Sequence, residues 1–301
     1  MSVMSENSNQ TAAQMTEAMI LDTLAVVRFS QKDALPFLQG QLTQDLLGDK
    51  GRLLAAGYCS PKGRLIATPR LVVESGDSVL AILPKAGLES IVKRLRMYVL
   101  RSKVTISVDE RLAVLGFVGA VPESFEGCPV YAQASGLPAA LIAGALPAGR
   151  ALAIVPREKL PQTDSAESLY WAASIAAGDP WVFEGTREQF VPQGINLECT
   201  GGVSFTKGCY TGQEIVSRVE HIGKTARRAA LFAANREIDL APGADILENG
   251  QPAGILVQSS ARAGRTLMLV QVELDRVSSS GLTADGEALH PLPLPYRYER
   301  A

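Results

Sequence analysis

Short strand-like and helix-like segments follow one another along this chain without the strict alternation that builds a parallel sheet. Residues 24–30 (LAVVRFS) and 64–74 (RLIATPRLVVE) are apolar runs of strand type, and residues 84–100 predict a helix entered through Pro84. Turns rich in glycine and proline, such as SPKG at 60–63, join successive strands. This order predicts an α+β fold whose sheets are mainly antiparallel.

The last quarter of the chain has a purely β pattern. Short apolar runs at 227–234 and 266–274 are separated by turn sequences, and Asn249-Gly250 is the dipeptide that two-residue hairpin turns prefer. From about Thr225 onward the pattern therefore predicts a small β-barrel or sandwich.

The chain has 301 residues, about twice the length of a typical single domain, so several subdomains are expected. The polar opening segment 1–19 has the composition of a mobile tail. We predict a first α+β subdomain at 20–110, a second at 111–225 and the β subdomain at 226–301. Interleaving of the first two subdomains is left open.

Charge and hydropathy argue against broad classes of partner. The net charge of −2 and the pI near 5.8 do not favour extensive binding to nucleic acid or anionic membranes. Segment 1–19 lacks the basic and apolar regions of a secretion signal. The apolar stretch 136–156 is broken by two prolines and an arginine, whereas a membrane-spanning helix needs about 20 apolar residues. We expect a cytoplasmic protein that neither crosses a membrane nor binds nucleic acid directly.

The four cysteines are scattered along the chain at Cys59, Cys128, Cys199 and Cys209. They form no C-x-x-C pair, and the two histidines do not lie at the spacing of zinc ligands. We therefore expect free thiols in a reducing cytosol and no stably bound metal.

One of these cysteines lies in unusual company, within FTKGCYTGQEIVSR at 205–218. Thr211 and Glu214 have the spacing of a capping box, and the apolar periodicity predicts a helix that ends at Gly223. Cys209 would then precede the helix N-terminus, where unpaired N–H groups stabilise a thiolate.

The neighbours of Cys209 add to this interpretation. Residues two apart in an extended segment project to the same side, so the Lys207 ammonium is expected to lower the thiol pKa further. Gly208 removes a side chain beside the sulfur. On the residues alone a reactive thiol and a merely packed cysteine both remain open, because free cysteines are among the most buried residues.

The string KGCYTGQE at 207–214 resembles the signature of the YgfZ family of folate-binding proteins, which are relatives of the glycine-cleavage T-protein, an aminomethyltransferase. FLQGQLTQDL at 37–46, FVPQGINLE at 190–198 and PLPYRYE at 293–299 resemble this family in the same order. The resemblance implies a T-protein-like ring of three subdomains, two plait-like α+β units and a C-terminal β-barrel. Their central opening would accept tetrahydrofolate or a one-carbon derivative.

The same resemblance implies a role in supporting iron–sulfur enzymes, including those that modify tRNA, with the signature cysteine essential. The implied partners are folate and iron–sulfur client or assembly proteins. Cys209 is expected to be the reacting or ligating thiol, with Lys207 as its electrostatic neighbour. Tyr210, Gln213 and Arg218 fall on the signature too and are its candidate folate-binding residues, with Gln213 and Arg218 either contacting the ligand or holding the helix.

The closest enzymatic alternative is aminomethyl transfer to folate. In the resembled T-protein that chemistry uses an aspartate in a glycine-rich hairpin and a glutamate against the pterin. Here the matching hairpin at 57–70 carries Arg64, Leu65 and Ile66, and Ala176 stands at the glutamate position. We therefore expect an accessory protein and keep the transferase as the alternative.

Folate would need other contacts in this chain. Asp45 is a candidate acceptor for the pterin N–H groups, although a surface or capping role also fits it. Trp181 is a candidate stacking surface, although a large aromatic near a helix end is more often core. The basic run KRLRMYVLRSK at 93–103 fits either an anion site or a solvated helix face.

Overall fold

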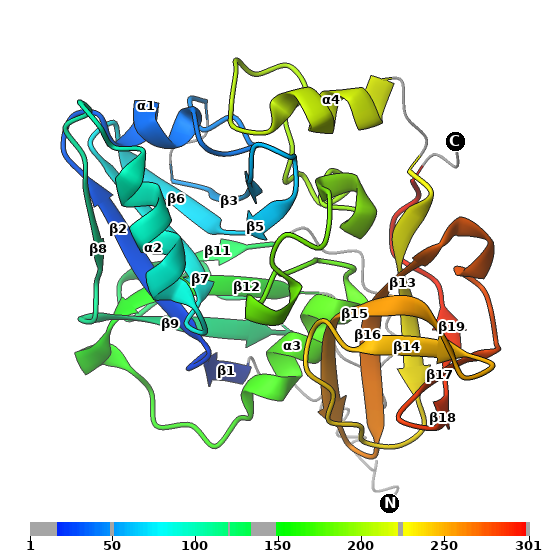
Figure 1. Ribbon diagram of the computed structural model, residues 1–301. Coiled ribbons are helices and arrows are strands. Elements are labelled where there is room, and N and C mark those ends of the chain that lie inside the picture. Colours follow the sequence, from blue (N-terminus) through cyan, green and yellow to red (C-terminus); the bar gives the residue numbers. More distant parts are fainter. Residues whose placement is uncertain (1–16, 49–50, 120, 134–148, 222–224, 299–301) are drawn as a thin grey trace, which may run out of the picture.

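The computed structural model describes residues 17–48, 51–119, 121–133, 149–221 and 225–298. It consists of two mixed α+β units and a C-terminal β unit, as Figure 1 shows. Residues 1–16 of the predicted tail, residues 136–148 of the apolar stretch and the expected helix end at Gly223 lie outside the described residues.

The first sheet has the strand order β3-β6-β7-β2-β8, and all its neighbours are antiparallel. Helices α1 and α2 cover one of its faces and share a hydrophobic core with it. The elements are β2 (Leu24–Ser30), α1 (Ala34–Gln39), β3 (Leu53–Ala55), β6 (Arg70–Ser75), β7 (Ser78–Pro84), α2 (Leu88–Met97) and β8 (Thr105–Val108).

The second sheet has the order β1-β9-β12-β11-β10 and is also antiparallel. Its strands are β1 (Glu17–Ile20), β9 (Leu112–Val118), β10 (Ser124–Phe125), β11 (Cys128–Ala132) and β12 (Arg150–Pro156). Strand β1 comes before the first unit in sequence but pairs with β9, so the two units interleave. Assigning residues 17–19 to the tail was therefore wrong, because this segment forms an edge strand.

Helix α3 (Glu167–Ala176) packs between the second sheet and the C-terminal unit. A small hairpin of β4 (Tyr58–Cys59) and β5 (Leu65–Ala67) leaves the first unit, and helix α4 (Gln213–His221) follows the cysteine motif. Four single-turn 3-10 helices complete the described connections: η1 (Arg157–Lys159), η2 (Glu184–Thr186), η3 (Pro192–Ile195) and η4 (Leu274–Arg276).

The C-terminal unit is a seven-stranded antiparallel sheet, of order β18-β17-β14-β15-β16-β13-β19, that curls into a nearly closed barrel. Its strands are β13 (Arg227–Ala234), β14 (Asp245–Glu248), β15 (Gln251–Arg262), β16 (Arg265–Glu273), β17 (Leu282–Ala284), β18 (Glu287–Ala288) and β19 (His290–Leu292). Asn249 and Gly250 form the β14–β15 turn with φ of 52° and 76°, which confirms the predicted hairpin.

The predicted α+β class with mainly antiparallel sheets and a C-terminal barrel is confirmed. The helix expected from Pro84 starts later, because Pro84 is the last residue of β7. Its N-cap is Gly87 at φ +68°, where an added Cβ would lie 2.4 Å from Nη2 of Arg187. The described part of the apolar stretch 136–156 includes strand β12.

No helix among the described residues is both long enough and apolar enough to cross a membrane.

Candidate functional site

Cys209 is the exposed cysteine of the four. Cys59 is buried, and Cys128 and Cys199 are partly exposed. Cys209 lies on the loop between the η3 region and α4, followed directly by the buried Tyr210. A sulfur in this position is open to solvent while the chain beside it is anchored.

Lys207 supplies much of that anchor. Its Nζ donates to the backbone oxygens of Gln39 (2.7 Å), Leu42 (2.6 Å) and Gln44 (2.9 Å). These bonds use all three donors of the ammonium group. Lys207 therefore ties the cysteine loop to the segment that follows α1, and its expected electrostatic effect on the Cys209 thiol stays a prediction.

The ammonium group of Lys207 belongs to a buried residue, of which only 7 % is exposed. Burial lowers its pKa to about 8, and the nearby carboxylate of Asp45 opposes this. The group is thus still a cation at neutral pH. The ring of Tyr210 lies 5.3 Å from Nζ, within cation–π range, and burial raises the pKa of this tyrosine. The Tyr210 ring is therefore part of the anchor.

Two glycines let the β4–β5 hairpin press against the cysteine motif. Gly212 has φ +86°, and a Cβ there would lie 2.6 Å from the backbone oxygen of Ser60. Gly63 has φ +67°, and a Cβ there would lie 2.7 Å from Cβ of Ile215. Cys59 is sealed beneath this contact, and burial raises its pKa to about 12. Gly212 of the motif is thus required, because the backbone of the hairpin lies too close to leave room for a side chain there.

This contact also explains why the predicted capping box does not form. Helix α4 begins at Gln213, so Gly212, and not Thr211, precedes its first residue. The Thr211 hydroxyl lies 3.5 Å from Oε1 of Gln41, and Glu214 pairs with Arg218 at 3.3 Å. Arg218 is exposed and Gln213 is partly exposed. Both remain open to a ligand or partner on the outer side of α4.

The two folate contacts predicted outside the motif have structural partners. Oδ1 of Asp45 accepts from the backbone N–H of Leu47 (3.1 Å) and from Nε2 of Gln39 (3.0 Å). The Leu47 bond is the main reason that the pKa of Asp45 is lowered. Trp181 is fully buried, with its ring 4.2 Å from the Arg70 guanidinium carbon. The expectation that Trp181 stacks on a ligand was therefore wrong, because its faces belong to the core.

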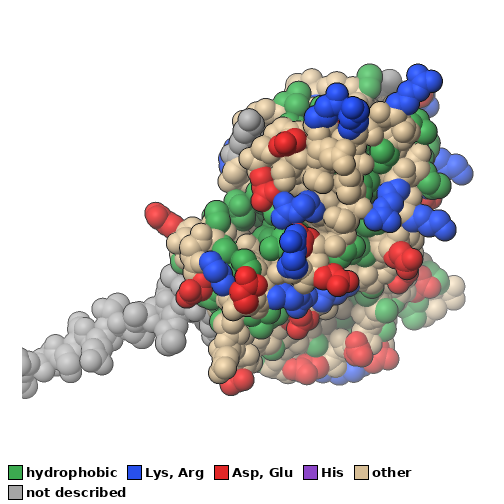
Figure 2. Space-filling model, turned by 90° about the vertical axis from the view of Figure 1, so that its left-hand side faces the viewer, with side chains coloured by type: hydrophobic (Ala, Val, Ile, Leu, Met, Phe, Trp, Pro, Cys, Tyr) green, Lys and Arg blue, Asp and Glu red, His purple; other side chains and the backbone are tan. Residues whose placement is uncertain are grey.

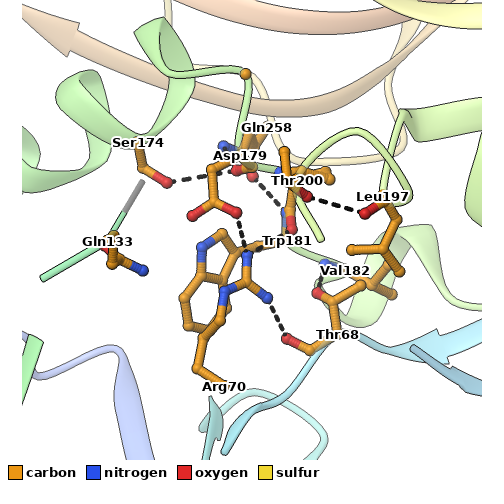
Figure 3. A network of polar contacts seen from close by, with 12 residues as sticks. Thr68, Arg70, Gln133, Ser174, Asp179, Trp181, Val182, Leu197, Thr200 and Gln258 are labelled. Atoms are coloured by element: carbon orange, nitrogen blue, oxygen red, sulfur yellow. Dashed lines mark hydrogen bonds and ion pairs between the residues drawn. The ribbon is translucent and has the colours of Figure 1, made fainter. Parts of the chain in front are cut away.

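The same region holds a buried ionic cluster that the sequence did not reveal, shown in Figure 3. Asp179, which follows α3, accepts from Nη2 of Arg70 at 2.6 Å and from Nη1 of Arg150 at 2.7 Å. Arg150 Nη1 also donates to Ser174 at 2.8 Å. From the barrel, Gln258 donates to the Asp179 backbone oxygen at 3.2 Å. Arg70 of β6 and Arg150 of β12 thus meet at the Asp179 carboxylate, while Gln258 of β15 contacts the backbone of the same residue, so all three units meet at Asp179.

This cluster carries one more positive than negative charge. The side chains of Arg70, Asp179 and Arg150 are 2 %, 7 % and 3 % exposed. Burial alone would raise the pKa of Asp179, but the two guanidinium groups outweigh it and the pKa is lowered. The sequence offered one signal of this cluster, namely that Arg70 and Arg150 each lie within an apolar strand. Their shared partner lies more than a hundred residues from Arg70.

A cavity of about 440 Å³ opens between the first sheet, the second sheet and the loop before the cysteine motif. Its walls mix apolar side chains with polar ones, an arginine, a tyrosine, a glutamine and a threonine among them. The lining residues include Gln44, Arg52, Leu53, Leu54, Val130, Tyr131 and Thr200. Gln44 bonds to Gly201 and Lys207 bonds to the Gln44 carbonyl, so this cavity and the cysteine loop share a support.

The part of the chain that the structure describes contains no group of three or more His, Cys, Asp or Glu side chains placed to hold a metal ion.

Two α+β units with antiparallel sheets and a terminal barrel define the T-protein-like class of folds. Among solved structures, the glycine cleavage system aminomethyltransferase T from Bartonella henselae superposes with a TM-score of 0.59. The match covers 93 % of this chain and 86 % of that chain at 12 % identity, which shows the fold alone.

Curated relatives give the family. Proteins named tRNA-modifying protein YgfZ from Shigella boydii and Escherichia coli are 31 % identical to this chain, and the one from Cronobacter sakazakii is 30 % identical. Each alignment covers 93 % of this chain and 93 % of the relative. The chain therefore belongs to the YgfZ family. A scan against models of protein families gave no match.

Proposed function

We propose that this protein is a cytoplasmic, tetrahydrofolate-binding accessory protein that supports iron–sulfur enzymes, including tRNA-modifying ones, through Cys209. The observation that carries the proposal is that Cys209 is exposed on a loop which the buried Lys207 holds in place by three hydrogen bonds. An accessible sulfur on an anchored loop can meet a partner in a defined orientation. A thiol that only packed would lie inside, as that of Cys59 does.

A single thiol limits what the site can do with a cluster. Iron–sulfur clusters are held by several protein ligands, most often four cysteine thiolates. The other three cysteines are buried or partly buried elsewhere in the chain. Cys209 would therefore act on a cluster or thiol that a client or assembly protein brings, and the open outer side of α4 leaves room for one.

The cavity beside Gln44 is the place proposed for folate. Its volume of about 440 Å³ lies in the usual range of small-molecule pockets. Leu53, Leu54 and Tyr131 offer apolar walls and a ring for a flat heterocycle, and Arg52 offers the kind of cation that binds the glutamate tail of a folate. These residue types fit the ligand, and the cavity wall in the described part of the chain contains no carboxylate.

Three observations favour an accessory role over aminomethyl transfer. In the hairpin at 57–70, Arg64 donates to the Gln189 backbone oxygen, and Leu65 and Ile66 are buried. Ala176 is buried in α3 and has no polar group to offer. Asp179, three residues further on, is already bound by two arginines. The described positions that would supply the transferase carboxylates therefore cannot take a folate amine.

The test is a titration of the purified protein with tetrahydrofolate, followed by tryptophan fluorescence and checked by calorimetry. The wild-type protein and the Cys209→Ala variant are expected to bind with the same Kd, because pocket and thiol are separate. An Arg52→Ala variant is expected to bind more weakly. Absence of folate binding in the wild type, or turnover of an aminomethyl donor with tetrahydrofolate, would contradict the proposal.

A further inference from the structure

The end of helix α2 presents apolar side chains to solvent among cations. Leu100 is 88 % exposed, Met97 61 % and Tyr98 36 %. The surface formed here, called the α2 surface below, comprises Lys93, Met97, Tyr98, Leu100, Arg101 and Lys103. Figure 2 shows the side of the molecule that carries α2, with Lys and Arg side chains over its upper and middle parts, interspersed with Asp and Glu side chains that are more frequent lower down.

The backbone at Leu100 is held in a conformation that leucine rarely adopts. The N–H of Ser102 donates to the Val99 oxygen at 2.7 Å, so Leu100 is the second residue of a tight turn. Its φ is +44°, in the left-handed region where glycine or asparagine is usual in such turns. The side chain packs little in return, since most of it faces water. Folding alone therefore gives no reason for a leucine at this position.

The cations around Leu100 are not used by ion pairs within the described parts of the chain. The ion pairs found there involve none of Lys93, Arg101 and Lys103. The nearby carboxylate of Asp33 accepts the backbone N–H of Lys103 at 2.7 Å. The surface thus combines three exposed cations that form no ion pair among the described residues with exposed apolar side chains.

We propose that the α2 surface docks an acidic protein face that has an apolar pocket for Leu100. An apolar centre with a polar rim, enriched in Met, Tyr and Arg, is the usual anatomy of a protein interface. RNA contacts would use the cations but would give Leu100 and Met97 no task. A bilayer would need a larger apolar face than three side chains. The proposal rests on the proposed function for one point only, that the docked protein is an iron–sulfur client or assembly protein.

The first test places photoreactive benzoylphenylalanine at Tyr98 in the full chain, expressed and irradiated in cells. The matched control carries the same residue at Asp239, which is exposed on the barrel. Sequencing of the crosslinked peptide should identify a protein segment rich in Asp, Glu and apolar residues, found at position 98 and not at 239. Crosslinks to RNA or lipid, the same products at both positions, or no product at 98 would overturn the proposal.

The second test measures how the purified partner protein, identified by the crosslink, binds to variants of this chain. Leu100→Gly should weaken its binding at least tenfold while the Tm stays equal or rises, because glycine relieves the left-handed backbone. Replacing Lys93 and Arg101 together by glutamate should weaken binding at least tenfold and reduce its salt dependence, whereas Arg262→Glu on β15 should leave it unchanged. Binding that survives both the Leu100 and the double replacement would overturn the proposal.

A third arm separates this proposal from the proposed function. The crosslink at position 98 is expected to persist in a Cys209→Ser background, because the surface and the thiol are separate. If the partner is acidic but is no iron–sulfur protein, the surface stands and the proposed function fails. If the crosslink is lost with Cys209, the surface proposal fails.

Discussion

The carboxylate of Asp179 is predicted to be a main point of contact between the first two units of the fold, because it accepts from Arg70 of β6 and Arg150 of β12. Replacing it by asparagine leaves Arg70 and Arg150 buried without a counter-charge, and both are at most 3 % exposed. Removing one partner from a buried ion pair costs about 3–5 kcal/mol. With an unfolding entropy of about 2.1 cal/mol/K per residue over this chain, that loss lowers the Tm by about 5–8 °C.

Calorimetry at neutral pH measures the effect of Asp179→Asn, with Arg150→Met as the matched comparison. Arg150→Met leaves Asp179 paired with Arg70 and removes the excess positive charge, so it should cost less. The lowered pKa of Asp179 makes its contribution present above the ordinary aspartate pKa and lost as the pH falls through the folded-state value. A Tm of Asp179→Asn within 1 °C of the wild type, or a larger loss of Tm in Arg150→Met, would refute this role of Asp179.

Two further predictions concern the cysteine loop and the acid range. Lys207→Met leaves three carbonyl oxygens without a donor and should lower the free energy of unfolding by about 2 kcal/mol. It should also change the alkylation rate of Cys209. An unchanged rate would show that the anchor does not control the reactivity of the thiol. The pKa of Asp109 is lowered to about 2, mainly by the hydrogen bond from Arg111 and further by the one from Arg28, while burial acts in the opposite direction. Its contribution to stability is present above the ordinary aspartate pKa and is lost as the pH falls toward 2. Carbon NMR should give this midpoint in the wild type and a higher one in Arg111→Ala, and a midpoint that does not move would contradict the assignment.

The features that sequence predicted well are those set by neighbouring residues. Asn249-Gly250 forms its turn because both residues tolerate positive φ without help from elsewhere. The α+β class followed from the order of short apolar runs and turns. The resemblance of the cysteine motif located a residue that the structure shows to be exposed.

The features that sequence did not predict depend on partners far along the chain. Lys207 lies two residues from Cys209, but its three acceptors are more than 160 residues away. Thr211 has the spacing for a capping box, yet the packing of Gly212 against the β4–β5 hairpin moves the helix start. Asp179 lies between Gly178 and Pro180, a sequence typical of a turn, and only the tertiary fold brings Arg70 and Arg150 to it. Local patterns contain none of these contacts.

We propose that the sulfur of Cys209 carries the cellular task of this protein. The direct measurement is the level of a tRNA modification made by an iron–sulfur enzyme, in cells whose own copy is deleted and replaced by a variant. Cys128→Ser, at a partly buried cysteine on β11, should restore the modification as the wild type does. Cys209→Ser should fail to restore it while accumulating to the same level as folded protein. Full restoration by Cys209→Ser would contradict the claim.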